Sequence, residues 1–368
     1  MKKRRTDKNK EPLMHIVKRD TIPFWKAVLI RLAGVLLALL VCAVVIVIIT
    51  KYNPINVYKA IISGAVGTKH RLWVTLKEGF TLLLVALALV PAFKMKFWNI
   101  GAEGQMLIGG VATAAVMIYF GDKLPAPVLI IVMVAASIAA GIIWGVIPAI
   151  FKARWNTNET LFTLMLNYVA IQIVNFCVTY WENPKGSNNV GTINFATESG
   201  WLNEALGPYG WHIVVTVLVL LLVFIYMNFS KHGYEIAVVG ESENTAKYAG
   251  INVKKVIIRT MAISGAIAAA AGFLAVSGAD HTIKAETAGG RGFTAIIVAW
   301  LAHLNPFVMV FISFLLVFLS RGSIEIASKF SLNESMSEVI TGIILFFILG
   351  CEFFINYKVQ FRKKGARA

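Results

Sequence analysis

The chain has 368 residues, of which 58% are hydrophobic and 15% charged, and this composition lies outside the range of soluble globular domains. Lysine and arginine outnumber aspartate and glutamate by 35 to 19, so the net charge is +16. The basic residues gather at the termini and in short connections between apolar runs, a pattern of membrane proteins and not of nucleic-acid-binding proteins. The three cysteines, Cys42, Cys177 and Cys351, lie inside apolar runs, where we expect neither a disulfide nor a metal site.

The N-terminal basic segment covers residues 1–26 and is too long for the start of a secretory signal peptide. The apolar run that follows, from Leu32 to Ile49, is long enough to span a bilayer by itself. We therefore expect a basic cytoplasmic segment over 1–26, a transmembrane domain over 27–357 and a basic cytoplasmic tail over 358–368.

Apolar segments recur along the rest of the chain when hydropathy is averaged over about 19 residues. They predict an all-α, polytopic membrane protein with about ten transmembrane helices, near residues 27–50, 75–93, 104–121, 127–151, 159–181, 212–229, 256–278, 290–303, 305–320 and 336–357. The segments 290–303 and 305–320 are short for a hydrocarbon layer of about 30 Å. They form either two spans, a re-entrant element or a tightly turned pair, so counts of nine and eight stay open.

The distribution of Lys and Arg predicts that both termini are cytoplasmic, which requires an even number of spans. With ten spans the connections 94–103, 152–158 and 230–255 are cytoplasmic, and the long connection 182–211 is external. The first external connection opposes this rule, because it carries Lys51, Lys59, Lys69 and Arg71. Placing that connection in the cytoplasm would reverse the predicted side of every later connection, so we expect it to be external and both termini to be cytoplasmic.

The cytoplasmic connection 230–255 contains the signals of a short helix. Ser242 or Glu243 is a suitable N-cap, and Gly250 is a suitable stop. A short amphipathic helix between two membrane helices is a natural docking element for a soluble partner, while an ordered loop without a partner explains the pattern equally well.

Polar residues at the start of the span 104–121 stand among four glycines, in the sequence FWNIGAEGQMLIGG. Glycine lets the backbone leave helical geometry, and such backbone is tolerated at membrane depth only where it is buried in protein or lines a cavity. Glu103 in this stretch is therefore either a carboxylate that caps the helix or a functional residue on a transport path.

A second polar group lies in the span 159–181, where Asn158 or Thr160 is a suitable N-cap. Thr163, Asn167, Gln172 and Asn175 follow at near-helical spacing, which predicts one polar stripe along the helix. Such a stripe faces either a water-filled path or a neighbouring helix to which it donates hydrogen bonds.

A second glycine-rich stretch runs from Ala288 to Trp300 and opens a short apolar segment from the external side. The stretch from Phe97 to Gly110 opens its span from the cytoplasmic side. Two glycine-interrupted segments of opposite orientation predict an inverted repeat of residues 75–181 and 256–357, a feature of transporters that points at the transport path.

Motifs of catalysis are absent from the sequence, including the P-loop, zinc-binding histidine pairs, the nucleophile elbow and Cys-x-x-Cys. We therefore expect no catalytic residue, no metal and no cofactor on this chain, and any ATP chemistry on another one. The alternative is an ion-coupled secondary transporter that acts alone. It would need carboxylates within the spans, whereas the glutamates lie near predicted span ends.

Four stretches together point to a known family: FWNIGAEGQMLIGG, NETLFTLMLNYVA, GYEIAVVGESENTAKYAGI and GRGFTAIIVAWLAHLNP. They resemble the membrane permease subunits of ABC importers for nucleosides, which are similar to the ribose and branched-chain amino acid permeases. The resemblance covers about residues 27–357 and implies import of nucleosides or related small sugars or nucleobases. It further implies a multi-pass protein of the bacterial cell membrane with a cytoplasmic ATPase, a second permease, homologous or identical, and an extracytoplasmic binding protein.

The resemblance also implies site residues. Carried over by position, the loop from Gly233 to Gly250 meets the ATPase, and its contact residues are expected to be Glu235, Gly240, Glu241, Asn244 and Tyr248. The transport path is expected near a second set, in which amides would bind sugar hydroxyls and base edges and aromatic rings would stack on a base. This set consists of Trp98, Asn99, Glu103, Gln105, Thr163, Asn167 and Tyr168.

Overall fold

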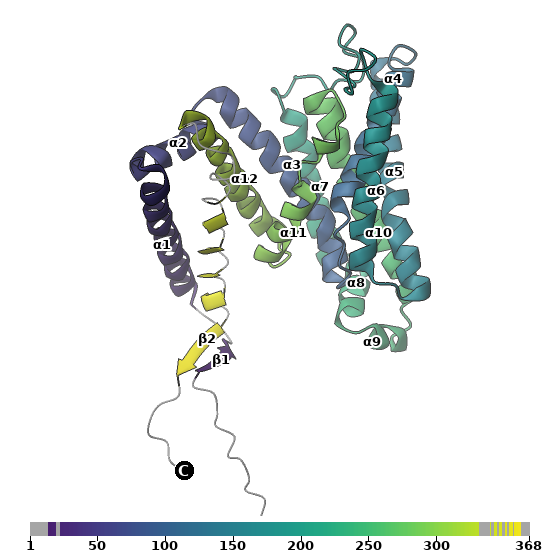
Figure 1. The fold of residues 1–368 in the computed structure, drawn as a ribbon. Helices are drawn as coiled ribbons and strands as arrows, with labels where there is room; N and C mark the ends of the chain where they lie inside the picture. Colours follow the sequence, from purple (N-terminus) through teal and green to yellow (C-terminus); the bar gives the residue numbers. More distant parts are fainter. Residues whose placement is uncertain are drawn as a thin grey trace, which may run out of the picture. The chain divides into compact units, whose positions relative to one another are not determined.

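The computed structural model is almost entirely helical, as the composition predicts (Figure 1). It describes residues 14–19 and 23–330, and in the C-terminal region residues 339, 342–343, 346–347, 350–351, 353–355 and 357–361. Within the described chain, seven helices are long and apolar enough to cross a membrane. The protein is therefore an all-α, polytopic membrane protein, and it divides into two compact units, residues 1–64 with 320–368 and residues 65–319.

The first unit contains α1 (Phe24–Thr50), most of α2 (Pro54–Val66), the last turns of α12 and a two-stranded ribbon. The ribbon pairs β1 (Met14–Lys18) with β2 (Tyr357–Phe361) in antiparallel orientation, so that Met14 lies opposite Phe361. This pairing places Met14–Lys18 beside Tyr357–Phe361, and the side of the membrane on which the termini lie stays a prediction. The predicted span 336–357 lies largely outside the described residues.

The helix α2 corrects the expectation of a loop between the first two spans. Val57, Ala60 and Ile61 are buried, and their spacing of three and four residues gives α2 one apolar face. The lysines of this connection suggest a polar loop, although the residues between them form an apolar helix face. Within the first unit α2 packs closely on α12, since a Cβ at Gly322 would lie 2.4 Å from Ile61.

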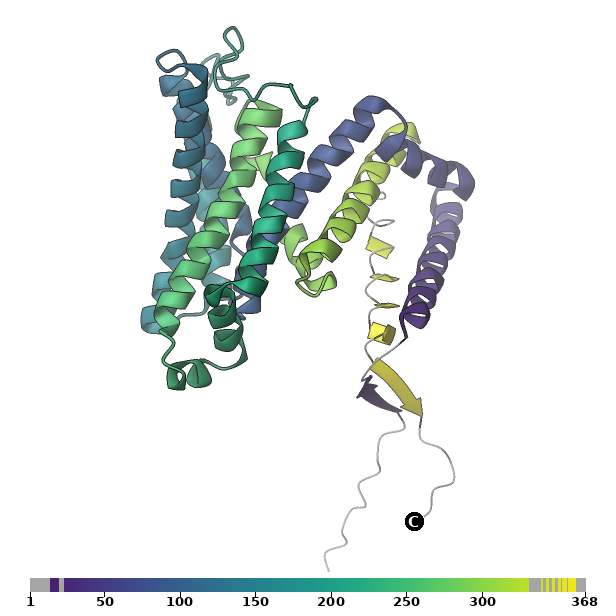
Figure 2. The ribbon, with the colours of Figure 1, turned by 180° about the vertical axis from the view of Figure 1, so that it is seen from behind.

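The second unit is a helical bundle around α10 (Figures 1 and 2). Its helices are α3 (Lys69–Lys94), α4 (Ala102–Phe120), α5 (Ala126–Trp155), α6 (Glu159–Trp181), α7 (Gly210–Phe229), α8 (Lys231–Glu241), α9 (Glu243–Tyr248), α10 (Val253–Ala275), which continues as a π-helical turn η1 (Val276–Asp280), the 3-10 turn η2 (Ala285–Thr287), α11 (Arg291–Leu301) and α12 (Pro306–Lys329). We call the end that carries α8 and α9 the inner end, and the end that carries the loop 182–209 the outer end.

Small residues let the backbone of α10 pack closely against the backbones of α4 and α5. A Cβ at Gly265 would lie 2.1 Å from the carbonyl oxygen of Gly141 in α5, and one at Gly272 would lie 2.1 Å from that of Met106 in α4. In lipid the hydrophobic effect does not drive helices together, so close van der Waals packing of this kind stabilises their association. It makes α10 the centre of the bundle, buried against α3, α4 and α5.

The helices α11 and α12 settle the arrangement of the segment 290–320. With 11 residues, α11 is only about 16 Å long and cannot cross a bilayer, whereas the 24 residues of α12 can. A turn at residues 302–305 joins them, with His303 and Leu304 in left-handed conformations. The segment is therefore not two full spans, and a short helix turns tightly into one helix of spanning length.

Candidate functional site

The inner end of the second unit carries a helical elbow formed by α8 and α9. Ser230 caps α8 by accepting a hydrogen bond from the backbone of Gly233, and Ser242 caps α9 by accepting one from Thr245. Gly250 follows α9 with a φ of +76°, a conformation that favours glycine. The predicted short helix with its Ser242 cap is confirmed, while α8, which precedes it, was not expected.

A hydrophobic cluster attaches the elbow to the membrane helices. Ile236 and Val239 of α8 and Ala246 of α9 are buried against the ends of α3, α5 and α10, together with Ala92, Met95, Phe97, Ala149, Val253, Val256, Ile257 and Met261. Gly240 permits this contact, because a Cβ there would lie 2.2 Å from the carbonyl oxygen of Lys94. The elbow is therefore fixed to the end of α3 and to the segment that follows it.

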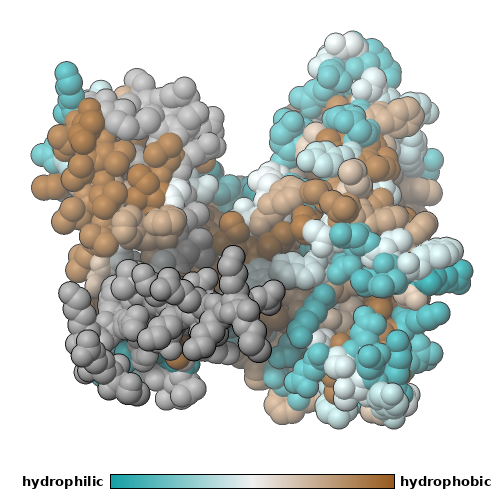
Figure 3. All heavy atoms as spheres, turned by 60° about the horizontal axis from the view of Figure 1, so that its bottom comes forward, coloured by the Kyte–Doolittle hydropathy of each residue, from teal (hydrophilic) through white to brown (hydrophobic). Residues whose placement is uncertain are grey.

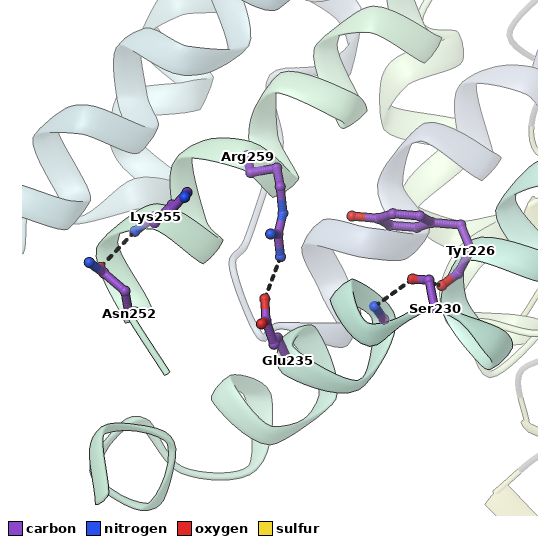
Figure 4. Close-up of polar contacts among 7 residues, drawn as sticks. Tyr226, Ser230, Glu235, Asn252, Lys255 and Arg259 are labelled. Atoms are coloured by element: carbon purple, nitrogen blue, oxygen red, sulfur yellow. Dashed lines mark hydrogen bonds and ion pairs between the residues drawn. The ribbon is translucent and has the colours of Figure 1, made fainter. Parts of the chain in front are cut away.

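An ion pair reinforces the attachment of α8 to α10. The Arg259 guanidinium donates a hydrogen bond of 2.8 Å to the Glu235 carboxylate (Figure 4). This bond holds the pKa of Glu235 below its usual value. Two of the predicted contact residues, Glu235 and Gly240, thus serve to hold the elbow in place.

The other three predicted contact residues face outward. Glu241, Asn244 and Tyr248 are exposed, and the Tyr248 side chain is 93% accessible. Figure 3 shows hydrophilic side chains gathered at the inner end of this unit. A large aromatic ring left fully exposed beside charged groups is typical of a surface that another protein covers.

The segment 95–101 leaves helical geometry inside the bundle, whereas three of the four glycines of FWNIGAEGQMLIGG lie within α4. Asn99 donates a hydrogen bond of 3.0 Å to Ser264, which lies about 17 Å from the start of α10. Since α10 with η1 has 28 residues and is about 42 Å long, α4 begins near the middle of the bundle.

Three predicted path residues form hydrogen bonds with the backbone of this irregular segment, and a fourth, Gln105, contacts one of them. Thr163 accepts a hydrogen bond from the Ile100 nitrogen, and Asn167 bridges the Ile100 oxygen and the Gly104 nitrogen. Asn99 accepts one from Gly101 and lies 3.4 Å from Gln105. All four side chains, of Asn99, Gln105, Thr163 and Asn167, are buried between helices, and their place beside a transport path stays a prediction.

Glu103, in the first turn of α4, forms hydrogen bonds with the start of α11. Its carboxylate accepts hydrogen bonds of 2.8 Å from the Gly290 nitrogen and 2.6 Å from the Gly292 nitrogen, at the start of α11. These nitrogens are free in an isolated helix, and a negative charge is favourable at a helix N-terminus. Both glycine-rich stretches thus lead to one junction, and of the two roles open for Glu103 the structure shows capping, of α11 and not of its own helix.

The polar residues of α6 divide between two faces, which corrects the expectation of one stripe. Thr163 and Asn167 lie on the buried face with Ala170, Val174 and Val178. Tyr168, Gln172, Asn175 and Thr179, spaced by four, three and four residues, form an exposed polar face. Tyr168 is 60% accessible and is the only predicted path residue of α6 that lies on the exposed face.

Trp98 is the other predicted path residue that is exposed. Its ring stacks on that of Trp300 in α11, with centroids 5.2 Å apart and planes 18° from parallel, and the two side chains are 44% and 52% accessible. Trp300 was missed, although it stands in the glycine-rich stretch that the sequence singled out. Thr179 was missed too, although it extends the spacing of Gln172 and Asn175 by one helical turn.

Comparison with known proteins identifies the family of this chain. Residues 72–349 match the family described as the branched-chain amino acid transport system permease component. The chain belongs to this permease family. It is 29% identical to a guanosine ABC transporter permease protein of Bacillus subtilis, over 92% of this chain and 97% of that protein.

Two further relatives have similar coverage. A glucose ABC transporter permease protein of Haloferax volcanii is 29% identical over 94% of both chains. A nucleoside ABC transporter permease protein of Lactococcus lactis is 27% identical over 88% of this chain and 91% of that protein. The permease is thus similar along nearly its whole length to subunits of transporters with different solutes.

Proposed function

We propose that this permease is the membrane subunit of an ATP-driven importer of nucleosides or related hydroxylated solutes in the bacterial cell membrane. The solutes named for the three relatives are guanosine, nucleosides and glucose, which all carry several hydroxyl groups. A separate cytoplasmic ATPase would use the ATP, a second permease would complete the pore, and an external binding protein would deliver the solute.

The outward-facing elbow carries this proposal. Glu241, Asn244 and Tyr248 are exposed at the inner end, while the opposite face of the elbow is buried against α3 and α10. An element with one face anchored and one face free can transmit the movement of a partner to the helices that it contacts. We expect the ATPase to cover Tyr248.

A mechanical route leads from the elbow to the middle of the bundle. Gly240 contacts the Lys94 carbonyl, and Met95 and Phe97 lie in the same buried cluster as α8. The chain then continues through Trp98 to Glu103, whose carboxylate holds the start of α11. A displacement of α8 would move this segment and alter the relation between α4 and α11, which supports alternating access at their junction.

Co-purification is the direct test. We expect an ATPase and a second permease to co-purify with the tagged permease after extraction in a mild detergent. We also expect cells that express the permease to take up labelled guanosine or glucose. A triple variant with Glu241→Ala, Asn244→Ala and Tyr248→Ala should remain in the membrane but lose the ATPase and the uptake. Glu204→Ala, which alters an exposed carboxylate of the outer loop, is the control. A permease that is repeatedly isolated alone, or full uptake by the triple variant, would overturn the proposal.

A further inference from the structure

We propose, on the basis of the function proposed above, that a polar pocket at the outer end of α6 binds the hydroxyl-bearing part of the solute before it crosses. The pocket has a volume of about 540 Å³, within the range of about 300–1,000 Å³ for small-molecule sites. Its polar lining comes from three segments: Asn175 and Thr179 of α6, Asn188 and Asn189 of the outer loop, and Lys284 and Glu286 around η2.

Hydrogen bonds form the loop wall of this pocket without a ligand. The Asn183 nitrogen donates to the Asn189 oxygen at 2.9 Å, and the Asn188 nitrogen donates to the Glu182 carboxylate at 3.1 Å. On the opposite wall the Thr179 hydroxyl lies 3.0 Å from the Asn175 carbonyl oxygen and 3.4 Å from the Asn188 side-chain oxygen. A preformed wall lowers the entropy cost of binding.

The segment that leads into η2 is also fixed to the outer loop. The Ile193 nitrogen donates to the His281 oxygen at 2.8 Å, and the His281 ring stacks on Trp201. The Lys284 nitrogen donates to the Thr287 hydroxyl at 2.9 Å, which orders the turn that carries Glu286. The three segments thus hold their polar groups around one hollow.

The lining offers both donors and acceptors that the protein leaves open. Within the described chain, the Lys284 ammonium and the Glu286 carboxylate have no hydrogen-bond or ionic partner, and the Asn175 amide has a single long contact of 3.5 Å to Gln172. A hydroxyl group donates and accepts at once, so it matches an ammonium, a carboxylate and amides together. The lining contains no aromatic ring, so the pocket suits a sugar or polyol and not the flat face of a base.

The exposed polar face of α6 connects the pocket to the membrane interior. Asn175 and Thr179 line the pocket, and Gln172 and Tyr168 continue the same face toward the middle of the helix. An exposed amide within a span must face water or protein, because lipid satisfies none of its hydrogen bonds. The pocket therefore lies at the start of a polar track and not at an isolated point of the outer loop.

Protection of an introduced cysteine tests the pocket. Ala285→Cys, at a lining position that offers the solute no polar side chain, is made in a transporter whose three native cysteines are replaced by serine, and whole cells without the binding protein are treated with a membrane-impermeant thiol reagent. We expect guanosine, D-ribose or D-glucose to slow the labelling, by roughly tenfold at ten times the dissociation constant. Glu204→Cys, an exposed site of the outer loop that does not line the pocket, should label at one rate with and without these probes.

A second variant guards against indirect effects. Adding Asn175→Leu to Ala285→Cys should leave the labelling rate unchanged without a probe but remove the protection by the probes. Labelling of Ala285→Cys that none of the three probes slows would overturn the pocket, as would protection that only the binding protein gives. Solute uptake with an attached ATPase but without protection would refute the pocket alone. Protection in a permease that never binds an ATPase would refute the proposed importer alone.

Discussion

Replacing Glu103 by glutamine tests the hydrogen-bonded junction between α4 and the start of α11. The carboxylate oxygens accept the Gly290 and Gly292 nitrogens at 2.8 and 2.6 Å. Glutamine has nearly the same shape but only one acceptor oxygen, so its amide group would face one of the two backbone N–H groups. The substitution therefore removes one charge-assisted hydrogen bond and leaves one buried N–H group without an acceptor.

The size of the effect follows from these two losses. A hydrogen bond to a charged group contributes about 1.5–3 kcal/mol, and an unsatisfied buried N–H group costs about 1–3 kcal/mol. Because the two terms overlap, we expect a loss of about 2–5 kcal/mol in the free energy of unfolding. At roughly 2–4 °C per kcal/mol for a domain of this size, the melting temperature should fall by roughly 4–20 °C.

Thermal unfolding in detergent, followed by the loss of monodisperse protein, measures this change, and solute uptake is measured in parallel. Glu204→Gln alters an exposed carboxylate of the outer loop and should change neither quantity. A Glu103→Gln protein that melts within about 2 °C of the parent and transports at the parent rate would refute the capping role of this carboxylate.

Three other substitutions test the remaining contacts. Gly240→Ala should lower uptake strongly, at a cost of about 1–3 kcal/mol for the forced separation from the Lys94 carbonyl, and a parent-like uptake rate would contradict the close contact. Glu235→Gln should weaken the attachment of α8 to α10 near neutral pH, seen as faster amide hydrogen exchange in α8. The pKa of Glu235 is lowered in the folded state, so the ion pair contributes its full stability above the usual glutamate pKa of about 4.3 and loses it as the pH falls below that value. The amide exchange rates of the parent and the variant should therefore be equal only in acid. Trp98→Ala should reduce uptake with little change in melting temperature, because the side chain is half-exposed; a large loss of stability instead would assign the ring to packing.

The span pattern could be predicted because hydropathy averages over many residues. Nine of the ten predicted apolar segments coincide with described helices, from α1 to α12, and the tenth lies largely outside the described residues. The short helix after Ser242 was predicted because capping is local, so that one side chain and the next three residues decide it. The glycine-rich stretch from Ala288 was predicted to leave helical geometry for the same local reason, and Gly289 and Gly290 have positive φ, whereas Gly104, Gly109 and Gly110 of the first stretch lie within α4.

The roles of the polar residues could not be predicted from the sequence. Asn99 and Asn167 have the amides that a sugar would need, yet their partners are Ser264 and the backbone at Ile100 and Gly104, which come from other segments of the chain. The sequence showed that these amides lie at membrane depth, but whether protein or solute satisfies them depends on which backbone passes beside them.

The sequence by itself determined that the chain is a polytopic membrane protein with interrupted helices, because hydrophobicity, basic loops and glycine placement act locally and need no knowledge of neighbours. The tertiary structure alone decided that Glu103 holds a helix that begins nearly 190 residues later, that α6 has two polar faces and that Gly240 contacts Lys94. These are contacts between segments far apart in the chain. Their energy depends on distances of a few ångströms that only the packing of the helices sets.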